Sequence, residues 1–291
     1  MAPEPLSRSA SPSPDRAPDR GSSVIIDTHC HLTHARFAAD RDDVITGLAF
    51  QGVAKVMTIG TSIADGRVAS GISRQYPERV ACSVGLDPFA CHAVGVAGFP
   101  AAFSELETLL KEGGFSAVGE IGLEYHHPLL AHDVQAAHFA KQLDLARAHD
   151  LPAVLHIRDA HDDAIRLLRA RWQEQRKNPE DMQKSPGVVH SFIGTADEAR
   201  AYLEMGWHLA FNGVVTYKAN GFLRDAVKIV PEDRLLVETD SPYLAPVPMR
   251  GKRCEPVHTW HTVDLIAQER GQTSAAVAAA TTANARRLFK W

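Results

Sequence analysis

The sequence contains few cysteines, and they form no recognisable pattern. Of the 291 residues only four are cysteine (Cys30, Cys82, Cys91 and Cys254), and none of them forms a Cys-x-x-Cys pair. A chain of this length does not need disulfides to fold. We therefore expect no disulfide framework, and we expect the protein to reside in a reducing, cytoplasmic setting.

Long hydrophobic runs are also scarce. No stretch approaches the roughly 18 consecutive apolar residues that cross a bilayer, so we expect a soluble protein that does not bind membranes. The first 22 residues are rich in proline and serine and lack an apolar centre, which excludes a secretion signal. We expect residues 1–22 to form a flexible tail without an assigned function, and residues 23–291 to form one domain.

Positive charge is not in excess. The sequence has 31 lysines and arginines against 35 acidic residues, a formal net charge of -4. No global cationic field therefore attracts nucleic acid, and any polyanion site must be local. Signatures of recognition helices, zinc fingers and RNP motifs are absent as well. Nucleic-acid binding is therefore expected to contact the sugar-phosphate backbone, without sequence specificity.

What the sequence does contain is a series of short apolar runs separated by amphipathic stretches. The runs are continuous rather than alternating and rich in valine, isoleucine and leucine, which is typical of parallel strands buried on both faces. They cover residues 24–32, 54–60, 80–86, 116–123, 152–157, 187–192, 208–213 and 234–240. The pattern predicts helices at 38–51, 99–112, 133–149, 195–205, 257–270 and 274–290.

Eight strand-helix units without a change of composition predict an α/β fold, a single (β/α)8 barrel. Such barrels usually have about 250 residues, and 269 residues follow the expected tail. A doubly wound open sheet is the alternative, but no Gly-x-Gly-x-x-Gly motif follows the first run.

Polar residues recur at the carboxyl ends of the predicted strands, which meet at one face of a parallel barrel, where barrel active sites lie. His29 and His31 are two positions apart, so both should point into the barrel while Cys30 points outward. The strand-end residues are His29, His31, Glu120, His156, His190 and Asp240.

These six residues predict a metal site. A single histidine would more often be a buried structural residue, and a purely structural cluster is the alternative for the set. Four imidazoles and two carboxylates at one rim would be costly to bury without a shared partner, and a metal ion binds both types. One catalytic ion uses only about three protein ligands, whereas two ions about 3.5–4 Å apart would use all six. We expect two divalent ions (Zn, Mn or Mg), with Glu120 as the bridge.

Five blocks carry a resemblance to a known family. The blocks DTHCHL, VGEIGLEY, LHIRDA, VVHSFIG and ETDSPYLAPVPMRGKRCEP stand in the same order as those of the TatD family of metal-dependent deoxyribonucleases, which this chain resembles from residue 24 to 290. The resemblance implies a metallo-dependent hydrolase of the (β/α)8 type that cleaves DNA, with 3′-5′ exonuclease and DNA repair activities. It implies that His29, His31, Glu120 and Asp240 hold one ion, and that Glu120, His156 and His190 hold the other. Glu120 and Asp240 are the expected catalytic residues, with Asp240 orienting the attacking water and accepting its proton.

Two residues near these blocks are candidate substrate contacts. Arg158 follows His156 by two positions and could hold a phosphate through two hydrogen bonds; pairing with Asp159 at the surface is the alternative. Tyr243 could stack on a base or pack under its own loop.

The block MRGKR supplies three cations, Arg250, Lys252 and Arg253, just past the predicted barrel rim. Such a local patch would steer a phosphate backbone to the site despite the negative net charge. A solvated run of charges is the alternative. The expected substrate is DNA, single-stranded or at 3′ ends.

The sequence departs from the family after the third strand. Many TatD relatives carry Gly-x-His-Pro there, and the histidine approaches the substrate phosphate, whereas this chain has Asp87 in its place. A carboxylate repels phosphate unless a cation intervenes, and Asp87 is therefore a candidate determinant of substrate binding. Hydrolysis of another ester or an amide, as in a deacylase, is one alternative function. A metal-loaded binding protein with little turnover is another.

Overall fold

The computed structural model describes residues 20, 22–175 and 186–291. Eight parallel strands lie side by side in chain order around a barrel, so the predicted (β/α)8 fold is confirmed. The strands are β1 (Ile25–Cys30), β2 (Val53–Gly60), β3 (Val80–Val84), β4 (Ala117–Glu124), β5 (Ala153–Arg158), β6 (Gly187–Val189), β7 (His208–Phe211) and β8 (Leu235–Val237). Each falls within or overlaps one predicted apolar run. The expected tail, apart from residues 20 and 22, lies outside the described residues.

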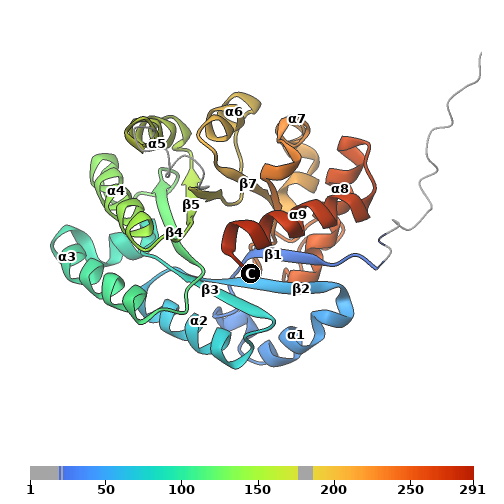
Figure 1. Ribbon diagram of the computed structural model, residues 1–291, viewed down its shortest axis with the longest axis horizontal. Helices are drawn as coiled ribbons and strands as arrows, with labels where there is room; N and C mark the ends of the chain where they lie inside the picture. Colours follow the sequence, from blue (N-terminus) through green and yellow to red (C-terminus); the bar gives the residue numbers. More distant parts are fainter. Residues whose placement is uncertain (1–19, 21, 176–185) are drawn as a thin grey trace, which may run out of the picture.

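Helices surround the strands (Figure 1). They are α1 (Arg41–Gly47), α2 (Ile63–Gln75), α3 (Pro88–Glu112), α4 (His132–Ala148), α5 (His161–Gln175), α6 (Ala196–Glu204), α7 (Phe222–Ile229), α8 (Thr259–Arg270) and α9 (Ser274–Phe289). The start of α6 illustrates how the sequence sets these bounds. Thr195 Oγ1 accepts from Glu198 N at 3.2 Å, and Glu198 Oε2 accepts from Thr195 N at 2.6 Å, which forms a capping box.

The barrel closes through backbone hydrogen bonds between β1 and the segment after β8. Asp240 N donates to His29 O at 2.8 Å, and His31 N donates to Ser241 O at 2.7 Å. The buried Asp27 carboxylate accepts from Thr239 N at 2.9 Å and from Thr239 Oγ1 at 2.6 Å. The tip of β1 is therefore fixed against a segment more than two hundred residues away in sequence.

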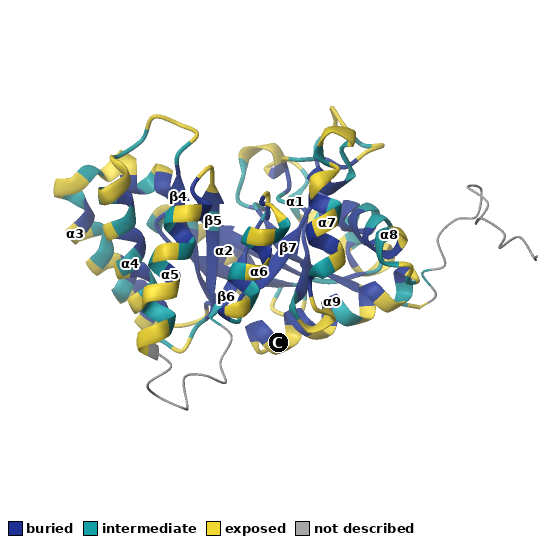
Figure 2. Ribbon diagram, turned by 90° about the horizontal axis from the view of Figure 1, so that it is seen from above, coloured by how far each residue is buried: buried dark blue, intermediate teal, exposed yellow. Residues whose placement is uncertain are grey.

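Apolar side chains fill the amino-terminal part of the barrel, where they pack with Leu288 and Phe289 of α9. This helix lies against β1 and β8 (Figure 1), and Figure 2 shows the strands buried at the centre of the molecule. The interior cluster contains Ile26, Met57, Ile59, Ala81, Ala117, Val154, Val188, Ala210 and Leu236. The inward-pointing polar residues are left at the carboxyl ends of the strands.

Helix α3 begins earlier than the sequence pattern predicts. The expected start was residue 99, but the helix starts at Pro88 because Asp87 caps it: Asp87 Oδ1 accepts from Ala90 N at 2.6 Å. Proline is favoured in this first turn because its missing N–H has no partner there in any case. Gly95 has φ 67° and ψ 175°, so the helix bends and is divided at this point.

Helix α3 also corrects the expectation that no segment is long and apolar enough to cross a membrane, because its length and composition meet that test. In this structure the helix is part of the outer layer of the barrel. Phe99, Leu106, Leu109 and Leu110 are buried in the main hydrophobic core.

Candidate metal centre

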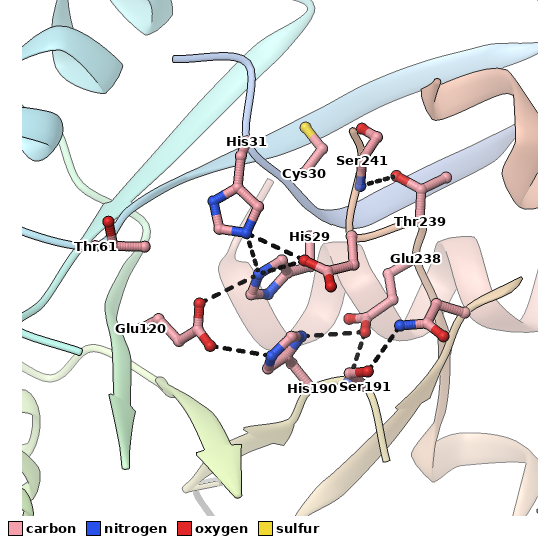
Figure 3. Close-up of polar contacts among 12 residues, drawn as sticks. His29, Cys30, His31, Thr61, Glu120, His190, Ser191, Glu238, Thr239 and Ser241 are labelled. Carbon is pink, nitrogen blue, oxygen red and sulfur yellow. Dashed lines mark hydrogen bonds and ion pairs between the residues drawn. The ribbon is translucent and has the colours of Figure 1, made fainter. Parts of the chain in front are cut away.

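Two histidines at the end of β1 begin the site. His29 Nε2 and His31 Nε2 lie 3.3 Å apart, and Figure 3 shows both rings turned to the same side while Cys30 points away, as the alternation predicts. His31 Nε2 also lies 3.1 Å from Asp240 Oδ1. Asp240 has φ 60°, in the left-handed region that few non-glycine residues adopt, and the closure of the barrel holds it there.

Glu120 on β4 joins the remaining residues into one cluster. Its Oε2 lies 3.5 Å from His29 Nε2, whereas its Oε1 lies 3.1 Å from His190 Nε2 and 2.6 Å from His156 Nδ1. Each carboxylate oxygen therefore faces a different set of imidazoles (Figure 3 shows His29 and His190). The structure brings all six side chains together, although Glu120 lies within β4, four positions before its end, and not at the strand end as expected.

Glu238 belongs to the cluster, although the sequence did not single it out. It is fully buried; its Oε1 accepts from Ser191 N at 2.5 Å and lies 3.3 Å from His190 Nδ1 (Figure 3). The His190 ring is stacked on the His29 ring with centroids 3.7 Å apart. Glu238 therefore supports the side of His190 that faces away from Glu120. The signal was an acid inside a predicted apolar run, two positions before Asp240, just as Asp27 stands two positions before His29.

Glu124 is a second carboxylate that the sequence reading gave no role. It is 1% exposed, and its Oε2 lies 3.2 Å from His156 Nε2. Its Oε1 accepts from the backbone N–H groups of His126 and His127 at 2.7 and 3.1 Å. Glu124 therefore connects His156 to the loop after β4.

The buried acids and histidines of the site shift one another's pKa values. Burial raises the pKa of Glu120, but the His190 and His156 cations outweigh it and hold the pKa well below its usual range. The pKa of Asp240 is lowered as well, because its hydrogen bond with His31 outweighs the effect of burial. Burial would lower the pKa of His156, but Glu120 raises it to about 9. Both acids are therefore ionised, and His156 carries a proton at neutral pH.

The pKa values of the two stacked histidines, His29 and His190, are shifted in opposite directions. Burial and the neighbouring His190 cation lower the pKa of His29. Burial would also lower the pKa of His190, but the charges of Glu120 and Glu238 raise it well above its usual value. His29 is therefore neutral at neutral pH, which is the form of imidazole that can bind a cation.

The donor set fits divalent metal ions. Ligand atoms gather within 4.8 Å in three overlapping sets: His29, His31 and Glu120; His29, His190 and Glu238; and Glu120, His156 and His190. Among the described residues, His29 Nδ1 and Glu238 Oε2 are buried without a hydrogen-bond partner. Imidazole and carboxylate together are typical ligands of zinc, manganese and iron. The first and third sets share the buried carboxylate of Glu120, and the chemistry of the donor set therefore supports the metal hypothesis.

Comparison with known proteins places this site in a family. The profile described as TatD related DNase matches residues 26–290. The chain belongs to this family. It is 32% identical to the "Uncharacterized metal-dependent hydrolase YabD" of Bacillus subtilis over 267 residues, covering 92% of this chain and 99% of the relative. It is 34% identical to the "3'-5' ssDNA/RNA exonuclease TatD" of Erwinia tasmaniensis over 270 residues, covering 91% and 99%.

A solved structure agrees with this assignment. The TatD homologue YJJV from Escherichia coli K12 superposes with a TM-score of 0.82 at 25% identity, covering 93% of this chain and 100% of the homologue. The protein is therefore a metal-dependent hydrolase of the TatD family with a (β/α)8 barrel.

The structure places two expected substrate contacts of this TatD protein at the mouth of the barrel. Tyr243 is 46% exposed, and its ring centroid lies 6.0 Å from that of His31. Arg158 is exposed at the end of β5. The alternative pairing of Arg158 with Asp159 is not formed, because Asp159 Oδ2 lies 3.1 Å from His126 Nδ1 instead.

The expected cationic patch is smaller than the sequence indicated. Arg253 is bound at 2.7 Å to each carboxylate oxygen of Asp40 and at 2.9 Å to Glu255, so it is not available to a substrate. Arg250 is exposed and lies over the Tyr217 ring, 4.2 Å from the centroid. Lys252 is exposed and forms no ion pair within the described part of the chain. Of the three cations of this block, only Arg250 and Lys252 remain candidate substrate contacts.

Asp87 has a structural contact that the sequence reading missed, since it caps α3. Burial, followed by the charge of Glu120, raises the pKa of Asp87 to about 7. The carboxylate therefore stands near the metal centre, and a substrate contact by Asp87 stays a prediction.

Proposed function

We propose that this TatD protein uses two divalent ions to remove nucleotides from the 3′ ends of single-stranded DNA. The observation that carries the proposal is the position of Glu120. Its two oxygens face separate sets of imidazoles, at 3.5 Å from His29 and at 3.1 and 2.6 Å from His190 and His156. This is the arrangement expected of a carboxylate shared by two ions.

The residues divide into two ligand groups around Glu120. His29, His31 and Asp240 would hold one ion with Glu120, and His156 and His190 would hold the other. When bound, two such cations lower the pKa of a water molecule and offset charge on the phosphoryl oxygens. Their identity is proposed as zinc or manganese, because imidazoles outnumber carboxylates, with magnesium as a substitute at high supply.

Asp240 is the proposed proton acceptor. Its low pKa keeps the carboxylate ionised at neutral pH, and His31 holds one of its oxygens at 3.1 Å. The carboxylate can therefore orient a water molecule and accept its proton. The electrostatic partners for DNA would be the exposed Arg158, Arg250 and Lys252, which favours contacts to the backbone over reading of bases.

The relatives support the substrate assignment, since the Erwinia tasmaniensis relative is named a 3'-5' ssDNA/RNA exonuclease. The test uses metal-free protein reconstituted separately with zinc, manganese and magnesium, and single-stranded DNA labelled at its 5′ end. A ladder shortened stepwise from the 3′ end, absent without metal and strongly reduced in Asp240→Asn, is expected. Intact DNA with all three metals would overturn the proposal.

A second candidate, hydrolysis of a carboxylic ester or amide, is favoured by the acidity of a neighbouring hollow. A cavity of about 510 Å³ lies among the segments that follow β4, β5 and β6. Its lining includes four acidic residues, Asp159, Asp162, Asp163 and Glu198. Such a wall repels phosphate and suits a neutral or cationic substrate. Parallel assays with p-nitrophenyl carboxylate and phosphate esters discriminate, because turnover of the carboxylate ester alone would support this candidate.

A cytoplasmic location and a role in DNA repair are further proposals. The four cysteines are all free and buried, which is compatible with a reducing compartment. Fractionation of cells that express the tagged protein tests the first, and survival of a deletion strain after DNA damage tests the second.

A further inference from the structure

A second exposed aromatic pair lies across the barrel mouth from Tyr243. Phe89, in the first turn of α3, is 43% exposed, and its ring centroid lies 5.3 Å from that of His127 in the loop after β4. Tyr243 follows β8 and lies 5.4 Å from His34, which follows β1. Because the strands run in chain order around the barrel, β1, β2 and β3 separate the β3–β4 edge from the β8–β1 edge. The metal centre is therefore flanked by two aromatic pairs.

The Phe89–His127 pair is held in a fixed position relative to the metal centre. Glu124 Oε1 accepts from His127 N at 3.1 Å and lies 3.3 Å from His127 Nδ1, while Glu124 Oε2 lies 3.2 Å from His156 Nε2. His156 in turn touches Glu120. Figure 2 shows the exposed loop above β4 on the same side of the molecule as α3.

Other apolar residues of α3 are exposed as well. Val94 and Val96 of the same helix are 38% and 60% exposed, and Asp87 turns its carboxylate to the helix start. The β8–β1 edge, in contrast, has the exposed cations Arg250 and Lys252. A nucleotide at the β3–β4 edge would thus find the exposed face of an aromatic ring, whereas the phosphates of the remaining strand would find positive charge at the β8–β1 edge.

We propose that Phe89 and His127 form a stacking site for the base of the 3′-terminal nucleotide, with the rest of the strand lying over the Tyr243 edge. This inference rests on the proposed nuclease function and adds to it the direction in which the strand lies. Bases stack on aromatic side chains without regard to sequence, because every base has a π-face. The site would therefore select a base-bearing terminus rather than a particular base.

The test compares an oligothymidylate that ends in a normal nucleotide with one that ends in an abasic nucleotide. Phe89→Ala is expected to raise KM for the normal substrate by about 10- to 100-fold with little change in kcat, and to change nothing on the abasic substrate. Phe89→Trp should restore the normal KM. Phe50→Ala is the matched control, since Phe50 is 95% exposed before β2, at the other end of the barrel.

Equal losses on both substrates, or no loss in Phe89→Ala, would overturn the stacking site while leaving the nuclease function intact. Thermal unfolding of each variant shows whether a loss comes from misfolding, and rescue by tryptophan separates stacking from folding in any case. If the wild-type protein cleaves neither oligonucleotide with any metal, the nuclease proposal and the stacking site both fall.

Discussion

Replacing Glu238 by glutamine should weaken metal binding without disturbing the fold. The carboxylate is fully buried, accepts from Ser191 N at 2.5 Å and lies 3.3 Å from His190 Nδ1. A carboxylate in this position fixes the orientation of a ligating histidine and increases its basicity. Glutamine retains the size of the side chain and can still accept from Ser191 N, but it removes the negative charge that faces His190.

The expected magnitude follows from the contact that is lost. Loss of a carboxylate that orients a ligating histidine typically costs about 10- to 100-fold in metal affinity. The effect should be concentrated on the ion held by His190, His156 and Glu120, because His190 is the ligand that the Glu238 carboxylate faces. Glu238→Ala should lose more, since it also leaves Ser191 N without its acceptor.

The assay is competition between metal-free protein and a chromophoric chelator for zinc, which reports the two dissociation constants. Glu232→Gln, the same exchange at an exposed residue before β8, is the matched control and should bind as the wild type does. Wild-type affinity for both ions in Glu238→Gln would refute the reasoning.

Two further predictions concern protons. Because Glu120 outweighs burial and raises the pKa of His156 to about 9, with the pKa values of His190 and His31 raised as well, zinc binding at pH 7 should release at least two protons per chain; calorimetry in buffers of different ionisation enthalpy measures this, and zero release would contradict it. Burial, with Arg234 and Arg287, lowers the pKa of His208 to about 4. The unfolded chain binds a proton at this histidine below about pH 6.5 and the folded protein does not, so the free energy of unfolding should decrease by about 2 kcal/mol between pH 7 and pH 5. Denaturant unfolding at both pH values should show a decrease that is smaller by this amount in His208→Gln than in the wild type. An equal decrease in both proteins would contradict the prediction.

The strands could be predicted from sequence because their burial on both faces produces continuous apolar runs, five of which carry or precede a candidate ligand. The runs at 187–192 and 234–240 were longer than β6 and β8, however, since both strands have only three residues. His190 and Asp240 follow their strands rather than ending them. The six side chains still meet at one face of the barrel, because the eight strands are parallel and their carboxyl ends lie at that face.

The start of α3 was missed although a signal was present. Asp87 followed by Pro88 is a favourable pair at a helix start, but the expected helix began only at residue 99. The structure accommodates both signals by bending the helix at Gly95. Family comparison had directed attention to Asp87 as a substrate residue, and its local capping role was overlooked.

Contacts between distant segments could not be read from the sequence. Arg253 was expected in the cationic patch, yet its partner Asp40 lies 213 positions away and is adjacent only in the fold. Asp27 and Thr239 are similarly separated by 212 positions. Strand patterns fix which residues reach the barrel mouth, whereas tertiary packing decides which of their charges are already paired.

The metal content of the purified chain tests the central claim most directly. Protein loaded with zinc or manganese and freed of excess ions by gel filtration is measured by elemental analysis, beside Glu120→Gln. The account predicts about two ions per wild-type chain and the loss of at least one of them in Glu120→Gln, because this carboxylate faces both ligand groups. A wild-type chain that retains no stoichiometric metal, or a Glu120→Gln chain that retains the full content, would contradict it.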